Sequence, residues 1–124
     1  MLIFLMNDGT QDSVIQIFDS LTEILGVSLF KRLFPVILTD NGVEFKNPQA
    51  LEHTRTGLSR TRVFFCDPQA SWQKPQVENN HHLIRRILPK GVSFSPLTVA
   101  DVTLICCHIN SVLRENLDNK HLWI

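Results

Sequence analysis

A chain of 124 residues is long enough for one domain with a hydrophobic core, and its 44% apolar content excludes a disordered protein. Twelve basic residues balance twelve acidic ones, so no overall charge draws the chain towards nucleic acid. No apolar run approaches the roughly twenty residues of a membrane span, which predicts a soluble protein. An odd number of cysteines gives no paired disulfide framework and favours a reducing cytoplasm, the three being Cys66, Cys106 and Cys107.

The first forty residues predict two strands separated by helices. Residues 2–5 are apolar and are expected to form a buried strand. Residues 13–25 repeat apolar side chains at spacings of three and four, which is typical of an amphipathic helix that Gly26 ends. A short helix is expected over residues 28–33, before a strand over residues 36–39 that is buried on both faces. This order predicts a βαβ crossover in which the two strands pair in parallel.

The strand at residues 36–39 leads into an acidic residue, Asp40, and then into a turn signal, Asn41-Gly42, whose two residues tolerate positive φ. In open α/β sheets ligands gather at the carboxyl ends of strands, so Asp40 is a candidate functional residue. The alternative is a plain β-hairpin closed by the Asn-Gly turn. Asp8 and Asp12 are assigned to a turn and to a helix start, and neither is taken as a metal ligand.

The second half of the chain predicts a strand followed by two helices. A helix start is expected at Asn47-Pro48, and a loop at residues 54–61. A β-rich strand is expected over residues 62–66, and the turn-rich segment over residues 68–76 is a candidate substrate-contacting loop. Two amphipathic helices follow, over residues 76–88 and 99–113. The last of these helices is capped by Thr98. The spacing of the histidines does not resemble a zinc site.

The helix at residues 76–88 carries a polar face beside its apolar stripe. Its buried residues are expected to be Val77, Ile84, Ile87 and Leu88. Glu78, His82 and Arg85 follow at spacings of four and three, so they share one side of the helix. The alternative is an ordinary solvated pair of charges at that spacing.

Basic residues are concentrated in one stretch of this neutral chain. Residues 54–92 carry seven bases against two acids, the bases being Arg55, Arg60, Arg62, Lys74, Arg85, Arg86 and Lys90. Such a local surplus is typical of a phosphate-binding surface. A solvated basic surface with no ligand explains the charge pattern equally well.

Several short motifs occur in a fixed order along the chain: Asp-Asn-Gly-Val-Glu-Phe at residues 40–45, Phe-Cys-Asp-Pro at 65–68, Ser-Trp-Gln at 71–73, Glu-Asn at 78–79 and Leu-Pro-Lys-Gly at 88–91. This set resembles the DDE-type transposases of the insertion-sequence-thirty family, within the retroviral-integrase-like group. The resemblance extends to about residue 114. It implies an α/β, ribonuclease-H-like catalytic core, of which residues 1–124 form a part that lacks the first strands.

In that family two aspartates and one glutamate hold two Mg²⁺ or Mn²⁺ ions. By resemblance the second aspartate is Asp40, and the glutamate, on a helix after the Trp-Gln motif, is Glu78. The flanking motif residues are Asn41, Gly42, Trp72, Gln73 and Asn79. The first aspartate belongs on an upstream strand, and we expect it to precede the start of this sequence.

The resemblance implies DNA transposition: metal-dependent phosphoryl transfer that cleaves a DNA strand and joins it to a target. The expected DNA contacts are Lys74, His82, Arg85, Arg86 and Lys90. The complete enzyme is expected to be a homo-oligomer in the bacterial cytoplasm, associated with the nucleoid, and this chain alone is expected to be inactive. Two alternatives stay open: a non-catalytic DNA-binding remnant of a transposase, and an unrelated α/β binding domain in which Asp-Asn-Gly is only a turn.

Overall fold

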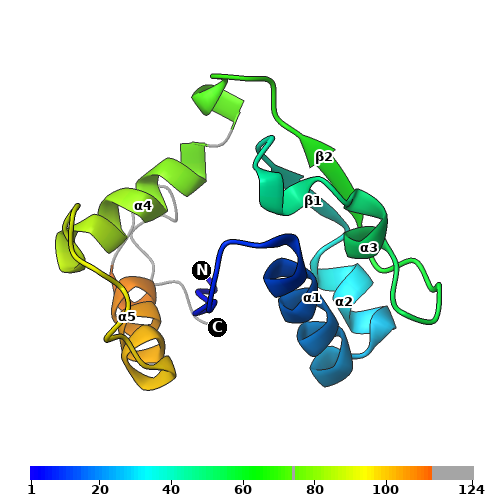
Figure 1. Cartoon of the computed structure of the whole chain (residues 1–124), viewed down its shortest axis with the longest axis horizontal. Coiled ribbons are helices and arrows are strands. Elements are labelled where there is room, and N and C mark those ends of the chain that lie inside the picture. Colours follow the sequence, from blue (N-terminus) through cyan, green and yellow to red (C-terminus); the bar gives the residue numbers. More distant parts are fainter. Residues whose placement is uncertain (74, 113–124) are drawn as a thin grey trace. The chain divides into compact units, whose positions relative to one another are not determined.

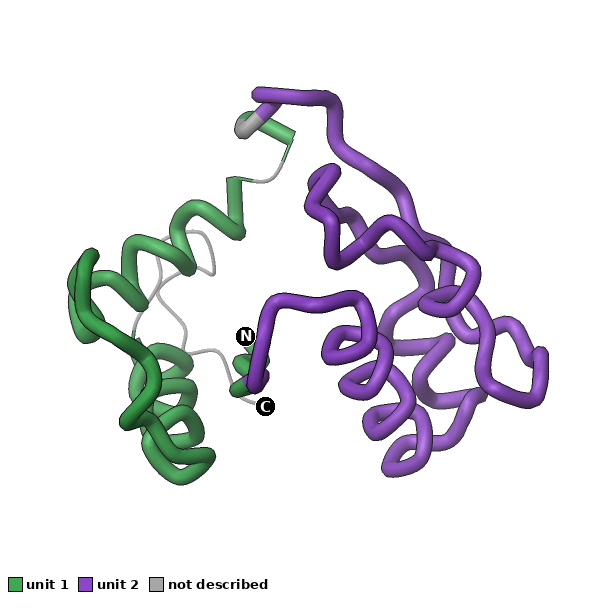
Figure 2. Tube along the Cα trace, viewed as in Figure 1, with its two compact units in different colours: residues 1–5, 71–124 green, residues 6–70 purple. Residues whose placement is uncertain are grey.

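The computed structural model describes residues 1–73 and 75–112, which form two compact units (Figure 2). The first, called the strand unit below, is Met6–Ala70. The second, called the helical unit, combines Met1–Leu5 with the described residues from Ser71 onward.

The strand unit contains the only sheet of the described chain, a parallel pair of strands (Figure 1). Its elements are α1 (Gln11–Leu25), α2 (Val27–Leu33), β1 (Val36–Thr39), the 3₁₀ turn η1 (Val43–Phe45), α3 (Pro48–Glu52) and β2 (Arg62–Phe65). In the register of the pair, Val36 lies opposite Arg62 and Thr39 lies opposite Phe65. The predicted mixed α/β class is confirmed, and these helices and strands begin within two residues of their predicted positions.

Hydrogen bonds at its first turn explain where α1 begins. The Thr10 side chain is the N-cap and accepts from the Ser13 amide, a bond that satisfies one of the helix's unpaired donors. The Asp8 carboxylate accepts from the hydroxyls of Thr10 and Ser13, and these bonds lower its pKa. Gly26, at a φ of 78°, ends α1 in a conformation that favours glycine. Asp8 therefore lies in a capping turn, as predicted.

The predicted strand at residues 2–5 is wrong. Residues 1–6 have no regular secondary structure, and β1 pairs with β2 instead of with the opening segment. A strand needs a neighbour for its backbone groups, and the start of the chain finds its partner on a helix. The Met1 carbonyl accepts from Asn110 Nδ2 at 2.9 Å, so the opening residues belong with the helical unit.

The sheet is open on one face, contrary to the prediction that β1 is buried on both. Side chains alternate along a strand, and Val36 (55% exposed), Leu38 and Phe64 are all exposed. The register puts these three on the same face. The opposite face carries Thr39, which is buried, Ile37 and Val63, which are half-buried, and Phe65, which is exposed at the end of the sheet.

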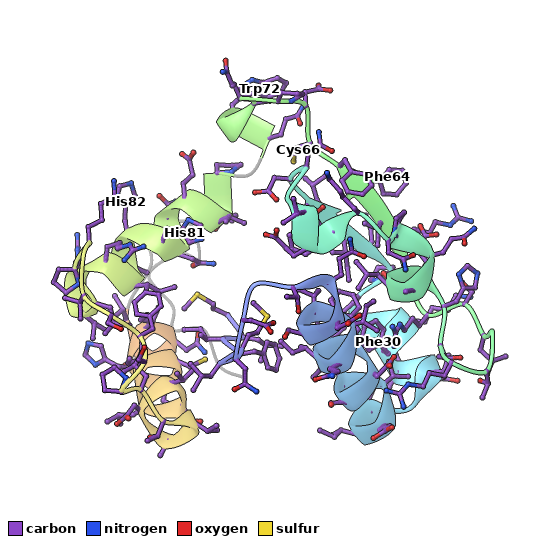
Figure 3. The ribbon with its side chains drawn as sticks, viewed as in Figure 1. Phe30, Phe64, Cys66, Trp72, His81 and His82 are labelled. Atoms are coloured by element: carbon purple, nitrogen blue, oxygen red, sulfur yellow. The ribbon has the colours of Figure 1, made fainter. Side chains whose placement is uncertain are left out.

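An arginine lies at the centre of the strand unit's core. The side chain of Arg60 has no exposed surface. Its guanidinium lies 5.6 Å from the Phe18 ring centroid and 5.8 Å from that of Phe30. Figure 3 labels Phe30 beside α1 and α2. Arg60 donates to Asp19 Oδ1 at 2.7 Å, to Thr22 Oγ1, and to the carbonyls of Leu51 and Ala50. Arg60 therefore ties α1 and α3 to the start of β2.

The helical unit consists of a 3₁₀ turn and two helices: η2 (Ser71–Gln73), α4 (Pro75–Ile87) and α5 (Val99–Ser111). Thr98 caps α5 as predicted, and its amide and hydroxyl donate to the Asp101 carboxylate. These bonds lower the pKa of Asp101, the hydroxyl bond being the larger cause. Residue 113, the predicted end of this helix, lies outside the described residues.

The apolar stripe predicted for α4 is not buried. No residue of α4 is buried, and Val77 and Ile87 are exposed. By contrast, α5 buries Val102 and Ile109. Within the described part of the helical unit, α4 contacts α5 and η2, and these contacts leave its stripe partly in solvent.

No single helix in the described ranges is long and apolar enough to cross a membrane. Only α1 and α2 taken together reach the required length and composition, as a pair bent by 112°.

Candidate active site and nucleic-acid interface

Asp40 follows the last residue of β1, at the carboxyl end of the sheet. Its Oδ1 accepts from the Gly42 amide at 3.3 Å, and its carbonyl oxygen accepts from the Thr39 hydroxyl at 2.9 Å. The side chain is exposed. The Cys66 amide, which donates to the Thr39 carbonyl at 2.7 Å, extends the pairing of the strands up to this point. Asp40 is therefore presented at the end of a paired strand, as predicted.

The turn after Asp40 differs from the expected one. The hairpin alternative is wrong, because β1 and β2 pair in parallel. Gly42 has a φ of −59°, so the turn does not use the positive φ that glycine allows. The absence of a side chain at Gly42 avoids a steric clash instead, because a Cβ atom there would lie 2.6 Å from Glu44 Oε2.

Glu44 and Asp67 are two further acids near Asp40 that the sequence analysis did not single out. The Glu44 carboxylate lies against Gly42, the residue whose amide holds Asp40. Asp40 directly follows β1 and Asp67 comes two residues after the end of β2, so the parallel register puts both at the same end of the sheet, with Asp67 one position further along. The sequence signal that could have found Asp67 is an acid directly after the predicted strand at residues 62–66.

Glu78 lies in the first turn of α4, where its side chain is exposed, as is that of Asn79. It belongs to the helical unit, whereas Asp40 belongs to the strand unit, so shared metal binding by the two stays a prediction. Within residues 1–73 and 75–112, no group of three or more histidine, cysteine, aspartate or glutamate side chains could hold a metal ion. The carboxylate oxygens of Asp40 and Glu78 are nevertheless the ligand type that Mg²⁺ selects.

The Trp-Gln motif forms η2, immediately before α4. Trp72 is 76% exposed, and Gln73 is half-buried; Figure 3 labels Trp72 on this turn. Lys74, a predicted DNA contact, lies outside the described residues. The motif therefore presents a large aromatic side chain to solvent beside the helix that carries Glu78.

A pocket of about 620 Å³ brings three of the predicted DNA contacts together at the C-terminal half of α4. Its lining residues are His81, His82, Ile84, Arg85, Lys90 and Phe94; Figure 3 labels the two histidines on α4. The Arg85 guanidinium lies 5.8 Å from the centroid of the Phe94 ring. Arg86, also a predicted contact, is exposed and does not line the pocket.

The sequence analysis did not single out His81 or Phe94. Phe94 lies in a loop that turns at Gly91, where φ is 87°, and nothing in the local sequence indicates that its ring returns to α4. The surplus of basic residues is also smaller at the surface than the sequence suggests. Arg60 is fully buried, and Arg55 is paired with Asp19 at 3.0 Å.

Comparisons with known proteins identify relatives along most of the chain. The transposase InsI of insertion sequence element IS30A from Escherichia coli K12 is 34% identical over 95 residues, which cover 76% of this chain and 24% of that protein. The transposase of IS4351 from Bacteroides fragilis is 32% identical over 87 residues, 70% of this chain and 26% of that protein. A putative integrase, ORF3 of Spiroplasma virus SpV1-R8A2 B, is 31% identical over 88 residues, 71% of this chain and 25% of that protein.

No family model matches the chain, and no solved structure matches it. The ribonuclease-H-like architecture therefore stays a prediction. The chain spans about a quarter of the length of the relatives that it matches. The predicted resemblance is confirmed at the level of the family: this chain is a relative of insertion-sequence transposases, including that of IS30A.

Proposed function

We propose that this chain is part of the ribonuclease-H-like catalytic core of a DNA transposase, which cleaves and joins DNA strands by metal-dependent phosphoryl transfer. The observation that carries the proposal is the position of Asp40. It lies at the carboxyl end of a parallel strand, in a chain related to transposases. Acidic residues at this position suit a site for a hard cation.

Asp40 and Glu78 would hold the cations, Mg²⁺ or Mn²⁺. When bound, two such ions activate the attacking oxygen and stabilise the leaving one. Asp40 contributes a carboxylate whose orientation is set by the Gly42 amide. Glu78 contributes one from the first turn of a helix.

Two carboxylates neutralise only half the charge of two divalent ions. We therefore expect this chain alone to bind metal weakly and to be inactive. In the active protein a third carboxylate would complete the site, and this protein would act on DNA as a homo-oligomer, in the bacterial cytoplasm at the nucleoid.

Paramagnetic broadening of NMR amide signals by Mn²⁺ tests the metal site without requiring activity. We expect the signals of Gly42 and Asn79 to broaden, and to recover in Asp40→Asn and Glu78→Gln respectively. Asp67→Asn is the matched control, since it removes one charge from the same sheet edge and should leave the broadening intact. Equal broadening in Asp40→Asn and the unaltered chain would refute the assignment.

Cleavage of supercoiled DNA with Mg²⁺ or Mn²⁺ tests the expected inactivity. The unaltered chain and Asp40→Asn should both leave the DNA intact. Cleavage by the unaltered chain that is lost in Asp40→Asn would show that the two carboxylates suffice.

A second candidate function is DNA binding without catalysis, and the pocket that holds His82, Arg85 and Lys90 favours it. The double variant Asp40→Asn/Glu78→Gln separates the two functions. Unchanged DNA affinity, together with no Mn²⁺ broadening in the unaltered chain, would support the binding function alone.

A further inference from the structure

The pocket on α4 combines cationic and apolar surface in a way that a simple phosphate-binding patch does not require. Phe94 and Ile84 provide apolar lining, and His81, His82, Arg85 and Lys90 provide hydrogen-bond donors. Among the described residues, no acidic side chain lines it. Its volume of about 620 Å³ lies within the range of pockets that enclose small organic molecules.

We propose that this pocket binds one unpaired nucleotide of single-stranded DNA, with the base stacked on Phe94 and the phosphate contacted by Arg85 and Lys90. The proposal rests on the proposed DNA function and adds the form of DNA that this surface recognises. The face of a base is covered by its neighbours in a duplex, and only a base outside the stack can lie against an aromatic ring.

The loop that carries Phe94 is held in shape before any ligand binds. The Leu97 amide donates to the Phe94 carbonyl at 3.0 Å, and the Ser95 amide donates to the Ser93 hydroxyl at 3.2 Å. Phe94 as a whole residue is 46% exposed, so part of its surface is open to a base. A preformed aromatic platform reduces the entropy lost on binding.

Arg85 connects the aromatic and cationic parts of the pocket. Its guanidinium lies over the Phe94 ring at 5.8 Å, and its Nη1 donates to the Leu88 carbonyl at 3.4 Å. These contacts orient a planar group with five donors, of which the hydrogen bond to Leu88 uses one. A nucleotide bound here would therefore meet a stacking surface and a phosphate-binding donor fixed against each other.

Fluorescence anisotropy with the full chain tests the inference, using three labelled probes: a 12-nucleotide single strand, the same backbone with abasic sites throughout, and the duplex. The single strand should bind about five- to a hundredfold more tightly than the abasic strand, the range that stacking of one base gives. The duplex should show no such gain from its bases.

Variants assign the effect to the pocket. Phe94→Leu should bring the ratio of single-strand to abasic affinity close to one, and Phe94→Tyr should preserve it. Arg85→Ala should lower both this affinity ratio and the salt dependence of the affinity for the single strand. Arg86→Ala is the matched control: it removes the same charge one residue away, and should lower the salt dependence while leaving the ratio unchanged.

Each outcome distinguishes this inference from the proposed function. A ratio near one in the unaltered chain, or a ratio unchanged in Phe94→Leu, would overturn the nucleotide pocket and leave the metal site untouched. Loss of Mn²⁺ broadening with the ratio retained would overturn the catalytic proposal alone. Failure to bind any of the three probes would overturn both the pocket and the DNA function.

Discussion

The buried ion pair between Arg60 and Asp19 should dominate the stability of the strand unit. In Asp19→Ala, the Arg60 guanidinium stays fully buried but loses its contact at 2.7 Å. Removing one partner of a buried pair costs about 3–5 kcal/mol of unfolding free energy. Three further bonds, to Thr22, Leu51 and Ala50, satisfy other donors of the guanidinium, which favours the lower end of that range. A domain of this size has only about 5–15 kcal/mol in total.

A double-mutant cycle separates the pair from general packing. Arg60→Met keeps an apolar stem between the rings of Phe18 and Phe30, but it removes the donor to Asp19 Oδ1 and the donors to two carbonyls, and leaves Asp19 only its bond from the exposed Arg55. We expect it to destabilise as much as Asp19→Ala does. The double variant Asp19→Ala/Arg60→Met should recover part of the loss, because no buried charge is left unpaired.

Urea unfolding followed by circular dichroism measures these changes, and Arg55→Ala provides the control. Arg55 contacts the same carboxylate, but its side chain is 77% exposed, and an exposed pair contributes about 1 kcal/mol or less. A loss in Asp19→Ala no larger than that in Arg55→Ala would refute the claim that burial determines the strength of this pair.

Three further predictions concern single residues. The pKa of Asp101 is lowered, so the stability that its carboxylate contributes is complete above the ordinary value of 3.8 and is lost as the pH falls through the lowered value. The melting temperature of Asp101→Asn, measured between pH 2 and 5, should therefore depend less on pH than that of the unaltered chain. Gly42→Ala should displace the Glu44 carboxylate at a cost of about 1 kcal/mol or less, because a flexible side chain can move away; a loss above roughly 2 kcal/mol would mean that the backbone has to shift. Cys107 is exposed and Cys66 is buried, so a thiol reagent should label Cys107 rapidly and Cys66 only on unfolding, as peptide mass mapping would reveal.

Features that depend on neighbouring residues in the sequence could be predicted. The apolar spacing of α1 and the caps at Thr10 and Thr98 are local patterns, and the helices follow them closely. The position of Asp40 at a strand end was predicted in the same way, from a short apolar run followed by a turn signal.

Features that depend on distant partners could not be predicted. The apolar residues 2–5 match a strand pattern, but a strand exists only where another strand pairs with it. Arg60 was counted as a surface base because arginine is rarely buried, and only the acceptors from α1 and α3 make its burial possible. Phe94 meets Arg85 through a loop whose path no periodicity encodes.

The core and the candidate site are linked through the sheet, and stability measurements can separate their roles. Asp40 is held by a turn on β1, β1 is held by β2, and β2 begins two residues after the fully buried Arg60. A variant that weakens this chain of contacts without touching a ligand tests whether the core orients Asp40. Asp40→Asn should abolish the Mn²⁺ effect on Gly42 and change the unfolding free energy by no more than about 0.5 kcal/mol, because the side chain is exposed. Asp19→Ala should lower the unfolding free energy and leave the Mn²⁺ effect on Gly42 intact, in conditions where the protein stays folded. Loss of the Mn²⁺ effect in this variant would show that the core sets the orientation of Asp40.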